Sequence, residues 1–288
     1  AGQGGLHDVI LAPDTGGEPT AYLSWVEAGE GGTGGVVGRA RLDVTGTPTL
    51  RGLEVIWRQT PKTSGDGHFS LRLAVDPTGE HLFVTSGERQ KMQPAQDLTN
   101  TLGTIVRLTP DGGAAPDNPY AARGGVSAQI WSHGHRNPLG IAFDAQGRLW
   151  ADEMGPRGGD EVNLIERGAN YGWPLASNGS HYNGQDIPDH VAGDGFAAPA
   201  VWWNPSISPA GLMIYDGTAF PQWRGDAFLG ALSGQALIRV DLDGTSAAKG
   251  DQWSMGARIR EVEQGPDGAI WVLEDGDGGR LLRLDPAA

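Results

Sequence analysis

One histidine in the first quarter of the chain has the surroundings of an acid–base group. His68 follows the glycine-rich loop Gly65–Gly67 and opens the alternating run Phe69–Leu73, which predicts a strand. A histidine where a loop enters a strand can face a cavity, and an unperturbed imidazole has a pKa of about 6.5, which suits a general base at neutral pH. On these residues alone, an ordinary histidine at a loop edge is the more frequent outcome.

The densest group of charged and turn-forming residues lies between Trp131 and Pro174. Arg136 and Asn137 stand side by side in it, and arginine presents a fixed fork of N–H donors that matches carboxylate and quinone oxygens. This pair predicts binding of an anionic ligand that bears carbonyl groups. His133 and His135 alternate around one glycine, a spacing that also fits metal ligation, but no third histidine or carboxylate is close by in sequence.

Two further positions could face a ligand. Arg258 and Arg260 alternate around one isoleucine and share a strand face, so the two like charges need either an anion or surrounding water. Trp202 and Trp203 precede an Asn-Pro turn and could form a stacking wall for a planar ligand or a sugar ring. The alternative for the tryptophans is core packing, which is the commoner outcome next to a proline.

Composition narrows the class of protein. The 288 residues carry a formal net charge of −14 and include no cysteine. The negative charge argues against a nucleic-acid partner, because phosphate binding depends on lysine and arginine, and the lack of cysteine excludes disulfides, cysteine-ligated zinc and a thiol nucleophile. No apolar window is long enough to span a membrane. No charged start followed by an apolar run opens the chain at Ala1, so an export signal is either absent or removed.

A loose internal repeat predicts the fold. Strand-like segments that end in an arginine and a turn recur after 66 residues, then after 132, then after a shorter interval, around Arg41, Arg107, Arg239 and Arg283. Turns that open onto an apolar strand recur at Asp76–Gly79, Asp144–Gly147 and Pro266–Gly268. Together with 47 glycines and 19 prolines, this period predicts an all-β propeller with blades of four short antiparallel strands. A two-sheet sandwich is the alternative.

Four motifs of the central stretch occur in the order of one known family: His135-Arg136-Asn137-Pro138-x-Gly140, Glu153-x-Gly155-Pro156, Gly159-Asp160-Glu161 and Asn170-Tyr171-Gly172-Trp173-Pro174. They resemble the signature of the soluble PQQ-dependent sugar dehydrogenases, in particular the aldose sugar dehydrogenase branch, and the similarity covers nearly the whole chain. The resemblance implies a six-bladed β-propeller that forms a single domain over residues 1–288. Because Gln3–Leu6 match a position well inside the family's domain, the first blade is expected to be incomplete in this chain.

The resemblance also implies roles for individual residues. His68 falls on the family's catalytic base, which takes the proton of the anomeric hydroxyl, and Arg136 falls on the residue that polarises the quinone together with calcium. The cofactor-binding positions are matched by Gln3, Arg136, Asn137, Ser206, Arg258 and Arg260. Glu88 falls where the family binds substrate hydroxyls. For Gln3 and Glu88, a solvated polar side chain is an equally good interpretation of the sequence.

Calcium binding is implied by the same resemblance. The backbone carbonyls of Gly155 and Pro156 match a corner that holds calcium next to the cofactor, and hard oxygen atoms are the ligands that calcium prefers. A second, structural calcium site is matched by Asp160, Glu161 and the carbonyl of Tyr171. The alternative for the two carboxylates is a capped turn with salt bridges to Arg157 or Arg167.

Taken together, the matched residues imply an enzyme that oxidises aldoses at the anomeric carbon to aldonolactones. Its cofactors would be PQQ and Ca2+, an external acceptor would take the electrons, and the location would be periplasmic or secreted. Three positions depart from the family: Gly67 replaces an acidic or amide residue, Ser233 a cofactor-binding lysine and Met154 a glutamine. Two other functions stay open, a calcium-dependent lactonase and a non-catalytic binding propeller. The sequence leaves open whether the chain forms a homodimer.

Overall fold

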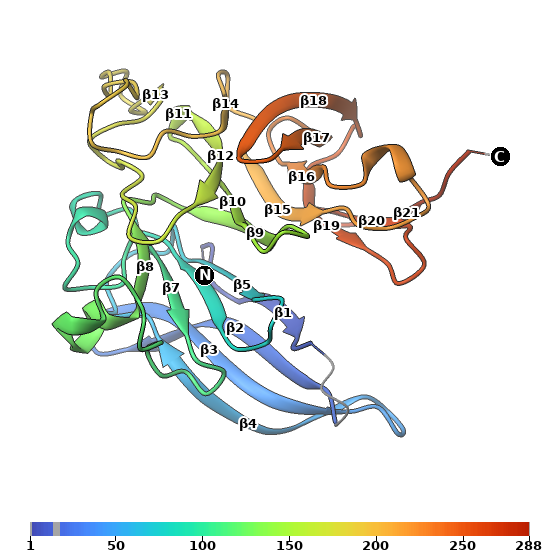
Figure 1. Cartoon of the computed structure of the whole chain (residues 1–288), viewed down its shortest axis with the longest axis horizontal. Coiled ribbons are helices and arrows are strands. Elements are labelled where there is room, and N and C mark those ends of the chain that lie inside the picture. The colour runs from blue at the N-terminus through green and yellow to red at the C-terminus, as the bar shows by residue number, and fades with distance from the viewer. Residues whose placement is uncertain (1, 14–17, 288) are drawn as a thin grey trace. The chain divides into compact units, whose positions relative to one another are not determined.

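The computed structural model describes residues 2–13 and 18–287, and in these ranges the regular structure consists of β-strands and short 3-10 helices. The chain divides into two compact units, residues 1–138 with 166–174 and residues 139–165 with 175–288. Figure 1 colours the strands of each unit along the chain. No helix in the described ranges is long and apolar enough to cross a membrane.

The first unit contains two four-stranded antiparallel sheets whose strands are paired in sequence order. The first sheet comprises β1 (Leu6–Leu11), β2 (Thr20–Gly29), β3 (Gly32–Asp43) and β4 (Thr49–Arg58). The second comprises β5 (Ser70–Val75), β6 (Leu82–Ser86), β7 (Thr104–Leu108) and β8 (Ile130–His133), with 3-10 helices η1 (Gln93–Gln96), η2 (Ala121–Arg123) and η3 (Gly125–Gln129) in its connections. β5 packs against the first sheet, and both sheets bury a common apolar cluster that includes Trp57, Phe69 and Leu71. This core fixes β5, which begins two residues after His68.

The second unit contains three sheets and a short ribbon. One sheet comprises β9 (Pro138–Phe143), β10 (Leu149–Glu153), β12 (Asp160–Ile165) and β14 (Val201–Trp203), and the ribbon pairs β11 (Arg157–Gly158) with β13 (Gly179–Ser180). The next sheet comprises β15 (Pro209–Ile214), β16 (Ala227–Ala231), β17 (Ala236–Asp243) and β18 (Ser246–Ser254), with η4 (Pro221–Trp223) in a connection. The last sheet comprises β19 (Ile259–Gln264), β20 (Ile270–Glu274) and β21 (Leu281–Leu284).

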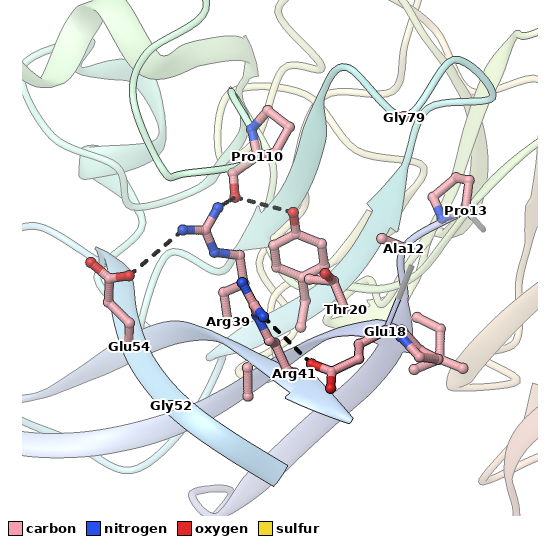
Figure 2. A pocket seen from close by; sticks show the side chains of 14 residues that line it. Ala12, Pro13, Glu18, Thr20, Arg39, Arg41, Gly52, Glu54, Gly79 and Pro110 are labelled. Atoms are coloured by element: carbon pink, nitrogen blue, oxygen red, sulfur yellow. Dashed lines mark hydrogen bonds and ion pairs between the residues drawn. The ribbon is translucent and has the colours of Figure 1, made fainter. Parts of the chain in front are cut away.

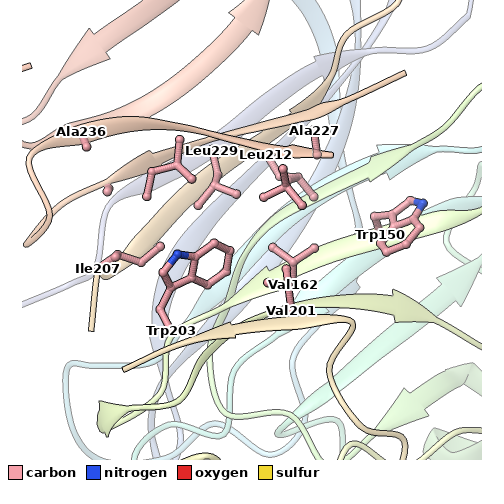
Figure 3. Close-up of a cluster of buried hydrophobic side chains, with 12 residues drawn as sticks. Trp150, Val162, Val201, Trp203, Ile207, Leu212, Ala227, Leu229 and Ala236 are labelled. Carbon is pink, nitrogen blue, oxygen red and sulfur yellow. The ribbon is translucent and has the colours of Figure 1, made fainter. Parts of the chain in front are cut away.

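A buried apolar cluster joins the first two sheets of the second unit. Figure 3 shows Trp203 from β14 with Val162 from β12 and Leu212 from β15 in this cluster. Trp203 is 6 % exposed, whereas Trp202 is 41 % exposed, because successive side chains of a strand point to opposite faces. The two tryptophans are therefore divided between core and surface and do not form a joint stacking wall.

The sequence repeat marks equivalent places in the sheets. Each of the four repeat arginines lies on the third strand of its sheet, namely β3, β7, β17 or β21. Each of the three repeat turns joins the first and second strands of a sheet. Consecutive sheets with this internal order are propeller blades, so the predicted all-β propeller with four-stranded antiparallel blades is confirmed.

The number and completeness of the blades differ from the prediction. The described residues form five blades, so the prediction of six is wrong. The first blade is complete, because residues 6–58 supply four paired strands, and it is the last blade that has three strands in the described ranges. The assignment of residues 1–288 to a single domain stays a prediction.

Candidate active site

A histidine and a carboxylate meet at one end of the second sheet of the first unit. His68 Nδ1 lies 2.5 Å from Glu88 Oε1. His68 precedes β5 and Glu88 follows β6, and because these two strands are paired, their adjacent ends bring the side chains together. His68 is 7 % exposed and Glu88 is 0 % exposed. A buried imidazole–carboxylate pair of this kind can orient a catalytic base.

Backbone groups determine how Glu88 bonds to the histidine. Oε1 of Glu88 also accepts the N–H of Gln90 at 3.0 Å, and Oε2 accepts the N–H of Met92. The carboxylate thus acts as a hydrogen-bond acceptor on both oxygens, which assigns the proton of the pair to His68 Nδ1. In the neutral ring, Nε2 is then the atom that can accept a proton.

Three more of the predicted residues form hydrogen bonds to the backbone of His68 or Glu88, or to strand β5. The amide oxygen of Gln3 accepts the N–H of His68 at 2.8 Å, so Gln3 is more than a solvated side chain. The carbonyl of Arg136 accepts the N–H of Glu88 at 3.0 Å, and Asn137 Oδ1 accepts a serine hydroxyl of β5 at 3.1 Å. The first unit therefore brings five of the predicted site residues into one group.

The side chain of Arg136 is held in a buried position. It is 4 % exposed, and its guanidinium lies 5.4 Å from the centre of the Trp173 ring. A cation against an aromatic face gains electrostatic stabilisation that is larger when both groups are removed from water. Arg136 thus presents a fixed positive charge, as recognition of an anionic or carbonyl-bearing ligand requires.

His133 and His135 have separate surroundings. The His135 ring stacks on Tyr171 with 4.6 Å between ring centres, and its Nε2 lies 2.9 Å from a serine hydroxyl of β8. The His133 ring meets Tyr120 edge-on at 6.0 Å, and burial, with a smaller effect of His135, lowers the pKa of His133 to about 4. No cluster of three histidines, cysteines or acids suited to a metal occurs in the described ranges. Metal ligation by this pair therefore gains no support.

The predicted calcium corner in the second unit is closed by Asp160. Its Oδ1 accepts the N–H of Gly155 at 2.8 Å, and its Oδ2 accepts the N–H groups of Ile207 and Ser208, each at 2.7 Å. The hydroxyl of Ser206 accepts the N–H of Gly158 at 2.8 Å. Asp160 thus ties the Gly-Pro corner to the segment that carries Ser206.

Asp160 is bonded to backbone N–H groups, as a capped turn would be, but Arg167, one of its two expected arginine partners, is engaged elsewhere. Arg167 belongs to the first unit, where it donates to the carbonyl of Asp117 at 2.9 Å. Tyr171, the third predicted member of the structural calcium site, is also part of the first unit and is buried there.

Two buried carboxylates face each other across β10 and β12. Glu153 and Glu161 are directly opposite in the strand register and are 6 % and 7 % exposed. Burial, followed by the neighbouring charge of Glu153, raises the pKa of Glu161 well above its ordinary value. Two such groups are stabilised by a proton or a cation between them, but the described residues bring no third acid or histidine together with them in a group suited to a metal.

The two predicted arginines of the last sheet share one carboxylate. Arg258 Nε lies 2.7 Å from Asp275 Oδ2, and Arg260 Nη2 lies 3.3 Å from Asp275 Oδ1. Their side chains are 46 % and 41 % exposed. Two guanidinium groups and one carboxylate leave one positive charge, so the pair can still attract an anion.

A cavity of about 700 Å³ lies on the first unit, away from the predicted residues. Figure 2 shows Arg39 bonded to the carbonyl of Pro110 and Arg41 bonded to Glu18 in its wall. It lies where β2 begins and β3 ends, and none of the predicted site residues lines it. Its lining carries no imidazole, so we place the candidate active site at His68 and not in this cavity.

Sequence reasoning missed three partners: Glu88 as the partner of His68, Asp275 between the arginines, and Glu153 opposite Glu161. A signal for the first was present. His68 and Glu88 are almost equally far from the Asp76–Gly79 turn, so a hairpin across that turn places them side by side.

The all-β propeller fold and the buried imidazole–carboxylate pair at a strand end together indicate an enzyme built on a propeller. The chain belongs to the glucose/sorbosone dehydrogenase family, whose sequence profile matches residues 1–283. It is 40% identical over 294 residues to the aldose sugar dehydrogenase YliI of Escherichia coli, covering 99% of this chain and 78% of that protein. The sequence resemblance is thereby confirmed.

Solved structures agree with this assignment. The soluble aldose sugar dehydrogenase of Escherichia coli in its apo-form matches with a TM-score of 0.93 at 40% identity, covering 99% of this chain and 84% of that one. The PQQ-bound aldose sugar dehydrogenase of Streptomyces coelicolor matches with a TM-score of 0.80 at 28% identity, covering 99% of this chain and 80% of that one.

Proposed function

We propose that this protein is a PQQ-dependent aldose sugar dehydrogenase that oxidises an aldose at its anomeric carbon to the aldonolactone. Support comes from family membership and from relatives named aldose sugar dehydrogenase, one of which is a PQQ-bound form. The observation that carries the proposal is the buried pair of His68 and Glu88, because it supplies the base that the oxidation of a hydroxyl requires.

In this proposal His68 is the general base. Its Nε2 accepts the proton of the anomeric hydroxyl, while Nδ1–H stays bonded to Glu88, whose negative charge stabilises the imidazolium that forms. As the proton leaves, the anomeric carbon forms the C=O bond of the lactone and releases its hydrogen with both electrons as hydride. PQQ, when bound, supplies the quinone carbon that accepts this hydride. The buried side chain of Arg136 would supply a fixed positive charge to the carbonyl oxygens of the cofactor.

The residues that would hold PQQ are Gln3, Arg136, Asn137, Ser206, Arg258 and Arg260. The donor groups of these residues fit a multiply charged anion. Arg258 and Arg260 share only one carboxylate, so one positive charge remains. The amide oxygen of Gln3 accepts the N–H of His68, and the NH2 group of Gln3 can still donate. Ser233 stands where the resemblance places a lysine, and its hydroxyl bonds to Ser208 Oγ at 2.8 Å and to the Ser206 carbonyl at 3.3 Å. Ser233 thus supports the Ser206 segment without adding charge, so we expect weaker PQQ binding than a lysine would give.

Calcium would bind at the carbonyls of Gly155 and Pro156, where it would polarise the quinone together with Arg136. The second site would use Glu161, Asp160 and the carbonyl of Tyr171. Of the two carboxylates, Glu161 is the stronger candidate. It lies opposite a second buried carboxylate, Glu153, whereas both oxygens of Asp160 accept backbone N–H groups.

The partners follow from the same proposal. The substrate is an aldose, an external acceptor takes the electrons, and the location is periplasmic or secreted. Glu88 as a contact for sugar hydroxyls and assembly into a homodimer are further proposals from the resemblance.

The test is a titration of metal-free protein with PQQ and calcium, followed by glucose-dependent dye reduction, on wild type, His68→Ala and His81→Ala. His81 is a matched control, because it also pairs with a carboxylate, Asp76, at 2.7 Å but lies at a surface turn. We expect saturable PQQ binding in all three and a rate loss of roughly 10³-fold in His68→Ala only. Binding of PQQ without turnover in wild type would support a binding propeller, and lactone hydrolysis without PQQ would support the lactonase.

A further inference from the structure

Arg89, the residue after Glu88, is a buried cation whose hydrogen bonds do not reach a carboxylate in the described ranges. It is 0 % exposed, and burial lowers its pKa to about 10, which leaves it charged at neutral pH. The acceptors of its side chain are three backbone carbonyls and one hydroxyl. Burying a charge is costly unless it is paired and hydrogen-bonded, and here the charges of Asp66 and Glu88 offset part of this cost while the four hydrogen bonds hold the guanidinium in place.

The contacts of Arg89 enclose the loop that delivers His68. Its Nε donates to the carbonyl of Gly67 at 2.9 Å, and its Nη2 donates to the carbonyl of Gly65. Its Cζ lies 3.7 Å from the centre of the Phe69 ring. Arg89 therefore contacts the residues directly before and after His68. Its own backbone N–H also donates to the carbonyl of His68 at 3.3 Å.

The other end of the guanidinium is anchored in the first sheet. Nη1 donates to the carbonyl of Thr33 on β3 at 2.6 Å, and Nη2 donates to the hydroxyl of Thr33 at 3.1 Å. Thr33 is itself paired with Thr63 through two backbone hydrogen bonds of 3.0 Å. Arg89 thus links the His68 loop to a fixed strand, and only a planar fork with five N–H donors can serve these acceptors together.

The backbone on both sides of this link is strained. Six of the eight non-glycine residues with positive φ in the described ranges lie in two short segments, His68, Ser70 and Leu71 in one and Arg89, Gln90 and Met92 in the other. Side-chain-bearing residues rarely adopt this region, and it persists only where surrounding contacts enforce it. The two segments are the ones that carry His68 and follow Glu88, so the strain is located at the catalytic pair.

We propose that Arg89 is a positioning residue for the general base. By holding the carbonyls of Gly65 and Gly67 and the face of Phe69, its guanidinium maintains the strained loop in which the His68 ring meets Glu88. This inference rests on the proposed role of His68. It does not require Arg89 to touch substrate or cofactor.

The first test compares Arg89→Lys and Arg89→Met with Arg107→Lys and Arg107→Met. Arg107 is a matched control in the same unit, 6 % exposed, 4.5 Å from the Trp131 ring and bonded to Asn118 Oδ1 at 2.7 Å. We expect both Arg89 variants to lose roughly 10²-fold in kcat, because a small displacement of a catalytic group has about this effect. KM and PQQ affinity should change by less than about threefold. The Arg107 variants should lower Tm to a similar extent but keep kcat.

The second readout is the proton of the His68 Nδ1–H bond to Glu88, observed by NMR in protein without PQQ or calcium. A short, charge-assisted hydrogen bond gives a resonance far downfield, which His68→Ala identifies by its loss. We expect the resonance to disappear in Arg89→Met and to persist in Arg107→Met. If Arg89→Met does not fold, the same measurement on Arg89→Lys tests the proposal, because a lysine cannot bridge the same acceptors.

Three results would overturn the inference. These are a retained resonance with wild-type kcat in a folded Arg89 variant, an equal loss of kcat in the Arg107 variants, or the absence of the resonance from wild type. The failure of the proposed function is distinguishable from these. If the resonance follows the expected pattern but the protein never oxidises sugar, the role of Arg89 in positioning His68 stands. Only the proposal of a dehydrogenase then fails.

Discussion

At the scale of residues, the orientation of His68 depends on how one carboxylate divides its hydrogen bonds. Glu88 Oε1 is shared between the His68 ring and the N–H of Gln90, while Oε2 is bonded to the N–H of Met92. The carboxylate is fully buried and fixed by its own turn. It can therefore orient the histidine and stabilise its protonated form without moving during the reaction.

Replacement of Glu88 by glutamine separates charge from geometry. Glu88→Gln keeps an oxygen that can accept from His68 Nδ1, but a neutral amide stabilises the protonated imidazole less well. We expect kcat to fall roughly 10- to 10²-fold and the acid limb of the pH profile of kcat/KM to move to lower pH. Steady-state dye reduction across the pH range measures both.

Asp76→Asn, next to His81, is the control for Glu88→Gln and should leave kcat and the pH profile unchanged. A rise in KM at constant kcat in Glu88→Gln would instead assign Glu88 to the substrate, as the resemblance implies.

At the scale of elements, aspartates stabilise the turns that join the first and second strands of the blades. Asp144 is 5 % exposed and accepts two backbone N–H groups of its turn, each at 2.9 Å, together with Arg148 Nε at 2.6 Å and Trp150 Nε1 at 3.0 Å. Asp267, at the equivalent turn of the last sheet, accepts one backbone N–H at 3.2 Å, and its side chain is 51 % exposed. The equivalent turns are therefore held by aspartates at different positions, one with buried hydrogen bonds and one largely exposed.

This difference predicts unequal effects of alanine. Asp144→Ala leaves several buried donors without an acceptor and should lower the free energy of unfolding by about 2–4 kcal/mol. Asp267→Ala leaves donors that water can reach and should cost roughly 1 kcal/mol or less. Urea unfolding of the two variants measures both values. Equal losses would show that burial at the Asp144 turn has no energetic consequence.

At the scale of the whole molecule, sequence reasoning was successful where the signal repeats. The repeat arginines and turns occupy equivalent strands and connections, so the blade architecture could be predicted. The blade count could not. The interval of 132 residues between Arg107 and Arg239 hides a blade without the arginine, and the place of the incomplete blade was inferred from the family match and not from strand pairing.

The site was predictable only in part for the same reason. The motifs around Arg136 and Gly155 identified the residues, but contacts such as that of Arg258 with Asp275 or of Arg89 with Thr33 join segments that no local pattern relates. The matched residues are divided between the two units, with His68 and Arg136 in the first and Gly155 and Arg258 in the second.

The most direct test of the dehydrogenase is a single turnover of calcium-loaded protein carrying one equivalent of PQQ, mixed with glucose under anaerobic conditions. The absorbance of the bound cofactor reports its reduction, and glucose deuterated at the anomeric carbon reports whether that C–H bond breaks in the step. We expect one cofactor to be reduced per protein, deuterium to slow the reduction, and His68→Ala to slow it by roughly 10³-fold. Bound PQQ that stays oxidised in wild type in the presence of saturating aldose would contradict the account.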